Sequence, residues 1–227
     1  MNAYFNHALN ELGTRYQTLG RFPRLLLMAF ATSLLVATAV FAMRPAALTD
    51  LGAGNNIARV QFFSLWDQGD LVVLVRHMER CDRSTNPCLA QPDGITAKGK
   101  RVADQLGLEF QKLGLAQANI YNSPLRRTEQ TATFAFNRTT ADQDWLIDCR
   151  RSMLDDVKAH KLDHHNLILV THSECIAALQ KSLNVPSPAS LDYGASLVIS
   201  INPSDGNPHV MGYVDAQDWG SILAKRP

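Results

Sequence analysis

Three short strand-like runs in this chain each lead into a polar tip that carries arginine or histidine, and this recurrence constrains the fold more than any other feature. The first run, residues 71–75, reads Leu-Val-Val-Leu-Val and leads directly into Arg76, His77 and, three residues later, Arg80. Such a run is typical of a short buried strand. Because ligands of open parallel α/β sheets lie beyond the carboxyl ends of the strands, this tip is expected to meet an anion.

The other two runs repeat the arrangement. Residues 118–121 are followed by Ser123 and Arg127 at the start of a predicted helix, with Ser123 as its N-cap and the next residue, a proline, in the first helical position. Residues 166–170 end in a Thr-His-Ser tip that carries His172. A helix N-terminus beside arginines attracts anions, so the three tips together predict a phosphate site.

Strands and helices alternate along the rest of the chain. Amphipathic spacing at Val102, Leu106, Phe110 and Leu113 predicts a helix between the first two apolar runs. Further strands are expected at 145–147, 196–201 and 209–214. This alternation predicts an α/β fold, a three-layer α/β/α sandwich with a mostly parallel central sheet, preceded by one N-terminal hydrophobic helix.

The ordered motifs resemble the histidine phosphatase superfamily, which has the phosphoglycerate mutase-like fold. The resemblance rests on Arg-His-x-x-Arg at 76–80, Ser-Pro-Leu-x-Arg-Thr-x-Gln-Thr-Ala at 123–132 and Val-Thr-His at 170–172, and it covers about residues 68–215. Within it, the unusual run Arg-His-Met-Glu-Arg-Cys-Asp-Arg-Ser-Thr-Asn-Pro-Cys-Leu at 76–89 is similar to the bacterial lipopolysaccharide core heptose(II)-phosphate phosphatases.

The resemblance assigns roles to the strand-tip residues. It implies that His77 is the nucleophile that becomes phosphohistidine and that His172 contacts the transferring group. It also implies a set of phosphate ligands: Arg76, Arg80, Arg127 and Ser123. Arginine suits this task because it stays ionised and offers a planar fork of donors to phosphate oxygens. Neutral imidazole is nucleophilic near neutral pH, so neither a cofactor nor a metal is expected.

The general acid that would protonate the leaving oxygen is left open by the sequence. The mutase-like branch uses a glutamate after its third strand, but segment 148–156 has no glutamate at the expected offset. The acid-phosphatase branch uses an aspartate directly after the second histidine, where this chain has Ser173. Glu174, Asp155 and Asp82 are the candidates, and water is the alternative donor.

Three other features near these motifs need an interpretation. Met78 occupies the position of the glycine that usually follows the catalytic histidine in the superfamily, and it is expected to narrow the approach or line the mouth of the site. Arg126 is expected to face solvent, because successive helical residues point in different directions. A set of residues before the third run is interpreted as a solvated helix end rather than a metal site: His160, Asp163, His164 and His165.

The N-terminal part of the chain predicts export. Residues 25–43 contain no charge, which approaches the ~20 residues of a membrane-spanning helix. Arginines precede this run, so a leader, 1–24, is expected to stay cytoplasmic. The run is either an inner-membrane anchor or the apolar region of a signal peptide cut after 40–42. A tether, 44–60, and a phosphatase domain, 61–227, are expected to follow.

The cysteines agree with export, since all four lie beyond the apolar run. Disulfides persist in the periplasm and are rare in the cytosol. Four cysteines allow three connectivities. We favour Cys81–Cys88, which closes a short loop beside the predicted site, and Cys149–Cys175, which ties two neighbouring strand ends. Free structural thiols are the alternative.

The expected function is that of a periplasmic phosphomonoesterase that acts on a phosphorylated sugar, by resemblance the lipopolysaccharide core heptose. Alternatives are a phosphohistidine protein phosphatase and an inactive, membrane-tethered phosphate-binding module. The chain holds 22 basic and 21 acidic residues, a balance that does not indicate a nucleic-acid partner.

Overall fold

The computed structural model describes residues 20–42, 48–137, 141–185, 190–201 and 206–226. The chain divides into two compact units, Met1–Ala46 and Ala47–Pro227. In the first unit, the predicted hydrophobic helix is present as α2 (Arg21–Ala42). Most of the predicted leader lies outside the described residues.

The transmembrane anchor predicted at 25–43 is not supported. Across the described stretches of the chain, no helix combines the length and the apolar character that crossing a bilayer requires. The signal-peptide interpretation of the same run stays a prediction, and the side chains around its expected cleavage site are not described.

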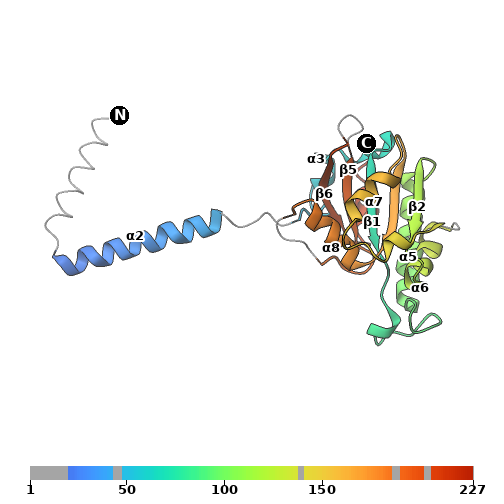
Figure 1. The fold of residues 1–227 in the computed structure, drawn as a ribbon, viewed down its shortest axis with the longest axis horizontal. Helices are drawn as coiled ribbons and strands as arrows, with labels where there is room; N and C mark the ends of the chain where they lie inside the picture. Colours follow the sequence, from blue (N-terminus) through green and yellow to red (C-terminus); the bar gives the residue numbers. More distant parts are fainter. Residues whose placement is uncertain (1–19, 43–47, 138–140, 186–189, 202–205, 227) are drawn as a thin grey trace. The chain divides into compact units, whose positions relative to one another are not determined.

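The second unit is built on one six-stranded sheet with the strand order β3-β2-β4-β1-β5-β6 (Figure 1). Its strands are β1 (Leu71–Arg76), β2 (Ala118–Asn122), β3 (Ala141–Asp142), β4 (Asn166–Thr171), β5 (Ser196–Ile201) and β6 (Pro208–Val214). The first four strands in this order are parallel, while β5 and β6 pair antiparallel. The predicted mostly parallel sheet is therefore confirmed.

Alternate residues of each strand point to opposite faces of the sheet, and apolar residues lie on both faces. Helices therefore cover both faces. Val73 and Val75 of β1 join the core beneath α3 (Asn56–Arg59), α4 (Phe62–Gln68), α5 (Ala97–Leu113), α6 (Arg126–Phe136) and α9 (Trp219–Leu223). Val72 and Leu74 join the opposite core, beneath α7 (Met153–His160) and α8 (Ser173–Ser182). The three-layer α/β/α sandwich is confirmed (Figure 1).

The compact unit begins earlier than the predicted boundary at residue 61. Leu51 and Ile57 are fully buried in the core on the α5 side, and Leu51 N–H donates to the carbonyl of Tyr213 at 2.8 Å. The described part of the predicted tether, 44–60, is therefore held on the domain by these two residues. Its apolar residues are too widely spaced to form a periodic pattern, which is why the sequence suggested a linker.

Two local predictions are wrong. The strand predicted at 145–147 is instead a 3₁₀ turn, η2 (Asp144–Leu146), which buries Leu146. The helix after β2 begins at Arg126 with Leu125 as its N-cap, so Ser123 is not the cap. The Ser123 hydroxyl is directed to His172 instead, as described below.

Candidate active site

The parallel strands β1, β2 and β4 end at one edge of the sheet, and the predicted site residues follow those ends. His77 N–H donates to the carbonyl of Thr171 at 2.9 Å, and Ser123 N–H donates to the carbonyl of Val170 at 3.0 Å. These backbone bonds continue the pairing of β1 and β2 with β4 for one further residue. They place the tips of the three strands side by side.

The imidazole of His77 is held in one tautomer by its backbone neighbour. Its Nδ1 lies 2.8 Å from the carbonyl oxygen of Met78, which can only accept a hydrogen bond. Nδ1 therefore carries the proton, and Nε2 carries the lone pair. Arg127 Nε lies 3.2 Å from that Nε2. The nucleophilic nitrogen of a neutral histidine thus faces an arginine of the predicted phosphate site.

The second histidine stands beside the first. The ring centroids of His77 and His172 are 5.4 Å apart, and His172 Nε2 lies 2.9 Å from the hydroxyl oxygen of Ser123. The other ring nitrogen of His172, Nδ1, is buried and has no hydrogen-bond partner among the described residues, and the same holds for Nε of Arg76. Unsatisfied buried polar groups are rare in proteins, and both groups can bond to oxygens of a bound phosphate.

Burial keeps both histidines neutral. It lowers the pKa of His77 to about 3, with additional contributions from the positive charges of Arg127 and Arg76. Burial also lowers the pKa of His172 to about 4, assisted by the charge of Arg127. Neutral His77 is the nucleophilic form, so at neutral pH the site requires no base to activate it.

Tyr193 is a site residue that sequence reasoning missed. The guanidinium of Arg76 lies 4.1 Å from the Tyr193 ring centroid, and the ring of His77 lies 5.6 Å from it. Arg76 also donates to the carbonyl of Leu191. Tyr193 precedes β5, whose antiparallel pairing with β1 brings its first residue to the same sheet edge. Only the strand order reveals this, since nothing in the sequence places the two segments together.

Arg80 is oriented by an acidic neighbour. Its Nε donates to Asp82 Oδ1 at 2.8 Å, and the two side chains form an ion pair. The bond from Arg80 lowers the pKa of Asp82, so this carboxylate remains ionised and is a poor proton donor. The pKa of Arg127 is lowered, first by burial and second by repulsion from the positive charge of Arg80. Two arginines that repel one another in this way are suited to share an anion.

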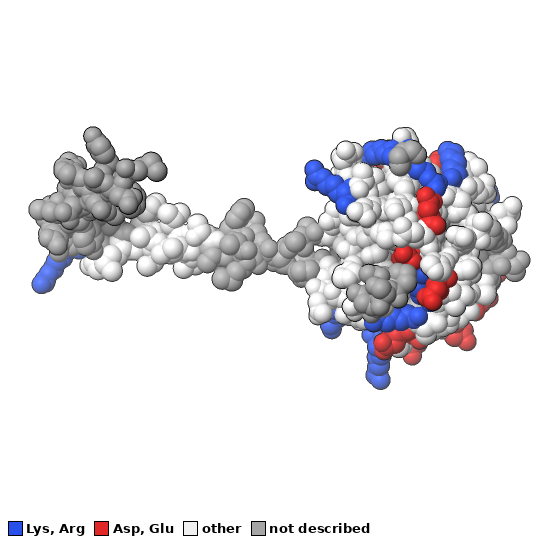
Figure 2. Space-filling model, turned by 90° about the horizontal axis from the view of Figure 1, so that it is seen from above, with Lys and Arg blue, Asp and Glu red and all other residues white. Residues whose placement is uncertain are grey.

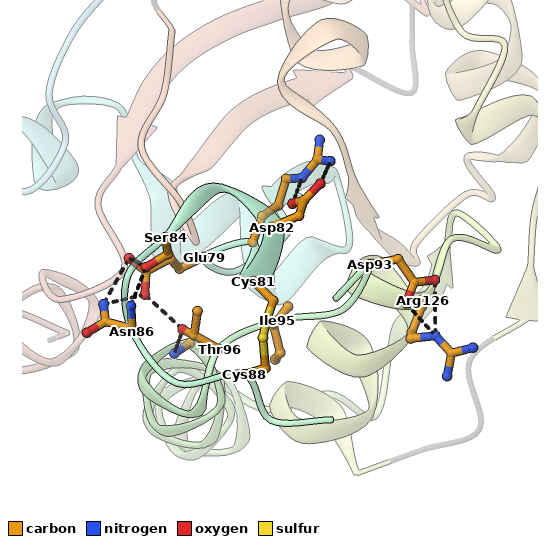
Figure 3. The surroundings of a disulfide bond; sticks show 12 residues. Glu79, Cys81, Asp82, Ser84, Asn86, Cys88, Asp93, Ile95, Thr96 and Arg126 are labelled. Carbon is orange, nitrogen blue, oxygen red and sulfur yellow. Dashed lines mark hydrogen bonds and ion pairs between the residues drawn. A yellow bond between two sulfur atoms is a disulfide. The ribbon is translucent and has the colours of Figure 1, made fainter. Parts of the chain in front are cut away.

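The loop that carries Arg80 is fixed by Glu79 and by a disulfide (Figure 3). The Glu79 carboxylate accepts bonds from the Thr96 hydroxyl at 2.8 Å, from the Asn86 amide at 2.9 Å and from the Ser84 hydroxyl at 3.1 Å. The predicted pairings are confirmed, because Cys81 is bonded to Cys88, and Cys149 to Cys175.

Of the candidate acids, the structure brings Glu174 to the site as well as Asp82. The negative charge of Glu174 acts on His172 and Arg127, whereas Asp155 is exposed on α7 and is not among the charges that act on either histidine. Burial alone would raise the pKa of Glu174, but the net shift is downward because its own backbone N–H and the Ser173 hydroxyl bond to the carboxylate. In the ligand-free protein Glu174 is therefore ionised.

Two further predictions concern Arg126 and the histidines that precede β4. Arg126 is exposed and pairs with Asp93 at 3.0 Å (Figure 3), so its predicted outward orientation is confirmed. His160 stacks on the ring of Trp145 with a centroid distance of 4.7 Å. Among the described residues, no group of three His, Cys, Asp or Glu could hold a metal ion. Basic and acidic side chains are interspersed on the face of the second unit that Figure 2 shows.

Comparisons with known proteins agree with this geometry. No family model matches the chain. A lipopolysaccharide core heptose(II)-phosphate phosphatase from Escherichia coli O6:K15:H31 is 35% identical over 148 residues, which cover 60% of this chain and 73% of that protein. The protein of the same name from Salmonella paratyphi B is 33% identical over 136 residues, or 57% of this chain and 67% of that protein.

A solved structure shows the same fold. Phosphoserine phosphatase from Entamoeba histolytica, in complex with 3-phosphoglyceric acid, matches with a TM-score of 0.51 at 13% identity, over 66% of this chain and 98% of that one. The sequence relatives, with this fold and the paired histidines at its sheet edge, show that the chain belongs to the lipopolysaccharide core heptose(II)-phosphate phosphatase family and is a histidine phosphatase, a phosphoric monoester hydrolase.

Proposed function

We propose that this enzyme removes phosphate from a heptose of the lipopolysaccharide core through a phosphohistidine on His77. The observation that carries the mechanism is the bond from His77 Nδ1–H to the carbonyl of Met78, which leaves the Nε2 lone pair directed at the arginine site. The substrate class is supported by the names of the sequence relatives, which are heptose(II)-phosphate phosphatases.

In the first step, Nε2 of His77 attacks phosphorus, and the bond from phosphorus to the sugar oxygen breaks. Arg76, Arg80 and Arg127 neutralise the charge on the phosphoryl oxygens, which is the main requirement for phosphoryl transfer. His172 bonds to one of the same oxygens through its buried Nδ1. The products of this step are the free sugar alcohol and phosphohistidine.

The leaving oxygen takes its proton from Glu174. A bound phosphate dianion raises the pKa of this carboxyl, because a like charge nearby disfavours the ionised form. In the second step, the Glu174 carboxylate accepts a proton from water as that water attacks phosphorus. The bond between phosphorus and Nε2 breaks, inorganic phosphate leaves, and neutral His77 is restored.

The proposed location is the periplasm. Cys81–Cys88 and Cys149–Cys175 account for all four cysteines of the chain, and disulfides persist in oxidising compartments. The apolar run at 25–43 is proposed to direct export. Lipopolysaccharide is an envelope component, so location and substrate agree.

The test compares wild type with His77→Ala on purified phosphorylated lipopolysaccharide and on para-nitrophenyl phosphate. We expect wild type to release phosphate from both, and radioactive phosphate from a labelled substrate to remain on the quenched protein as an acid-labile adduct. The variant should lose both turnover and label while still unfolding in one cooperative transition, which shows that the loss is not a failure to fold.

Three outcomes would count against the proposal. Label that survives His77→Ala would move the nucleophile elsewhere. Turnover of para-nitrophenyl phosphate without release from lipopolysaccharide would contradict the substrate, and turnover of phosphohistidine peptides in its place would indicate a protein phosphatase. No turnover of any phosphomonoester would indicate a binding module.

A further inference from the structure

A pocket with a mixed polar and apolar lining opens beside the catalytic residues at the same edge of the sheet. It has a volume of about 230 Å³ and is lined by residues of four segments: the turn after β1, the first turns of α5, the loop before β5 and the loop after β6. The lining residues that matter here are Met78, Lys98, Asp192, Tyr193 and Gln217. Its place follows from the topology, because β1 ends, β5 begins and β6 ends at this edge.

Tyr193 is the wall that this pocket shares with the phosphate site. Its ring lines the pocket, and the same ring lies 5.6 Å from the ring of His77 and 4.1 Å from the guanidinium of Arg76. The pocket and the phosphate site are therefore neighbours that share this side chain. One substrate can extend from the phosphate site into the pocket past this ring.

The floor of the pocket is Met78, in the position where the superfamily usually has glycine. A Cβ added at Gly99 would stand 3.1 Å from Met78 Cβ, and one added at Gly194 would stand 2.8 Å from Met78 Sδ. The methionine thus fills the space between these two glycines and is almost fully buried. It sets the depth of the pocket without removing any catalytic group.

The rim carries the groups that could recognise a ligand. Lys98, Asp192 and Gln217 are all exposed, and they offer an ammonium, a carboxylate and an amide. Within the described part of the chain, Lys98 makes no ion pair. Glu79 also lines the pocket, but Ser84, Asn86 and Thr96 already occupy its carboxylate.

We propose that this pocket binds one saccharide ring of the phosphorylated substrate, with Lys98, Asp192 and Gln217 bonded to ring hydroxyls and Tyr193 against the ring face. The volume lies below the ~300–1,000 Å³ of typical small-molecule sites, so it fits one ring rather than a peptide. Mixed donors and acceptors around an aromatic wall match a polyol. The inference rests on the proposed function and adds to it the residues that select the sugar.

The test measures selectivity in the full-length enzyme. The quantity is the ratio of kcat/KM for a heptose monophosphate to kcat/KM for para-nitrophenyl phosphate, which has no hydroxyl-bearing ring. We expect the double variant Lys98→Met, Gln217→Leu to lower this ratio at least about tenfold, through the loss of two hydrogen bonds to the sugar. Lys158→Met, on the exposed side of α7, makes the same change of residue type on the opposite helical layer and should leave the ratio unchanged.

A second probe is unphosphorylated heptose, which should inhibit the hydrolysis of para-nitrophenyl phosphate by wild type competitively and by the double variant much more weakly. An unchanged ratio with unchanged inhibition in the double variant would overturn the pocket proposal while the proposed function stands. Equal losses on both substrates in a variant that unfolds like wild type would also overturn it, since these residues would then support the phosphate site. Failure of wild type on every sugar phosphate would instead contradict the proposed function, and the pocket proposal with it.

Discussion

At the scale of single residues, the site depends on groups whose protonation is set by their surroundings. His77 and His172 are kept neutral by burial, Asp82 is kept ionised by Arg80, and Glu174 is kept ionised by bonds at the start of α8. In the proposed mechanism, the nucleophile His77 is thus ready before substrate arrives. The proposed acid, Glu174, is not, because in that mechanism it acquires its proton only when a phosphate dianion is bound.

The role of Glu174 can be separated from that of the arginines. Glu174→Gln should lower kcat on an alkyl phosphate by ~10²–10⁴-fold, the usual contribution of general acid catalysis. It should lower kcat far less on para-nitrophenyl phosphate, whose leaving group is a weak base. Arg127→Ala should damage both substrates alike, and Asp155→Asn, on exposed α7, should change neither. Equal losses on both substrates for Glu174→Gln would show that the proton comes from another source.

The lowered pKa values of the two histidines predict how stability depends on pH. Between the ordinary value of 6.5 and the lowered values of about 3 and about 4, the unfolded chain binds protons that the folded protein does not. The free energy of unfolding should therefore fall as pH decreases from 6.5 toward 4, with a slope of up to ~1.4 kcal/mol per pH unit for each histidine. Above pH 6.5 this contribution is constant.

Urea unfolding of wild type and His77→Gln at pH 7, 6 and 5 measures that slope. Carboxylates contribute equally in both proteins, so the difference between the two curves isolates His77. We expect a shallower decline in the variant, and no such change in His209→Gln, which alters an exposed residue of β6. Parallel curves for wild type and His77→Gln would show that burial does not penalise the charged form.

Sequence and structure agree on the residues that follow strand ends and differ where the contact depends on strand order. His77 and His172 could be predicted because each comes within two residues of an apolar run, and Arg127 because it lies at the start of the helix after β2. Tyr193 could not, since its contact with Arg76 requires β5 to pair with β1. The predicted N-cap role of Ser123 is wrong, because the helix begins later and the Ser123 hydroxyl contacts His172. Its predicted contact with phosphate stays a prediction.

At the scale of elements, the two disulfides stabilise different parts of the domain. Cys81–Cys88 spans seven residues of the loop after Arg80, whereas Cys149–Cys175 spans 26 residues and joins the segment after η2 to α8. The short bridge adjoins Arg80, a proposed phosphate ligand. The long one lies in the core beneath α7 and α8, where both of its cysteines are fully buried.

Removing each bridge should therefore have a different consequence. In the chain-entropy model, loops of these lengths contribute about 2.5 and about 3.5 kcal/mol to the free energy of unfolding. The double variant Cys149→Ser, Cys175→Ser should be the less stable in urea. The double variant Cys81→Ser, Cys88→Ser should lose more kcat/KM, because Arg80 directly precedes the loop that this variant frees. If this second variant kept full activity, Glu79 and its three hydrogen bonds would be sufficient to fix the loop.

The periodic elements could be predicted because the regular spacing of apolar residues that identifies a helix also stabilises it, by burying one face. In α5, Leu106, Phe110 and Leu113 are buried as their spacing requires. The segment at 145–147 has the composition of a strand, but the edge position beside β2 is taken by β3, and Leu146 reaches the core from a 3₁₀ turn. The composition of this segment indicates that it must bury an apolar residue. It does not indicate whether a neighbouring strand is free to pair with it.

At the scale of the whole molecule, the boundary between the two units shows what a pattern-based prediction overlooks. The catalytic unit extends to Ala47, and Leu51 and Ile57 add to its core although the segment around them has no periodicity. The three-layer sandwich was predictable because alternation of strands and helices leaves few packings. The residue at which the packed unit begins could not be predicted, since isolated apolar residues form no recognisable pattern in the sequence.

The proposed location makes a prediction for the whole chain. If residues 25–43 direct export, an alkaline phosphatase reporter, which is active only after export, should be active when fused behind residue 227 and inactive when fused behind residue 20. In the same cells, the chain should carry no free thiol in the non-reduced state, because its four cysteines pair beyond the apolar run. Replacing three residues of that run with arginine should abolish both reporter activity and disulfide formation. Reporter activity behind residue 20, or free thiols in the wild-type chain, would contradict export and would leave the two disulfides without the oxidising compartment that the proposal assigns to them.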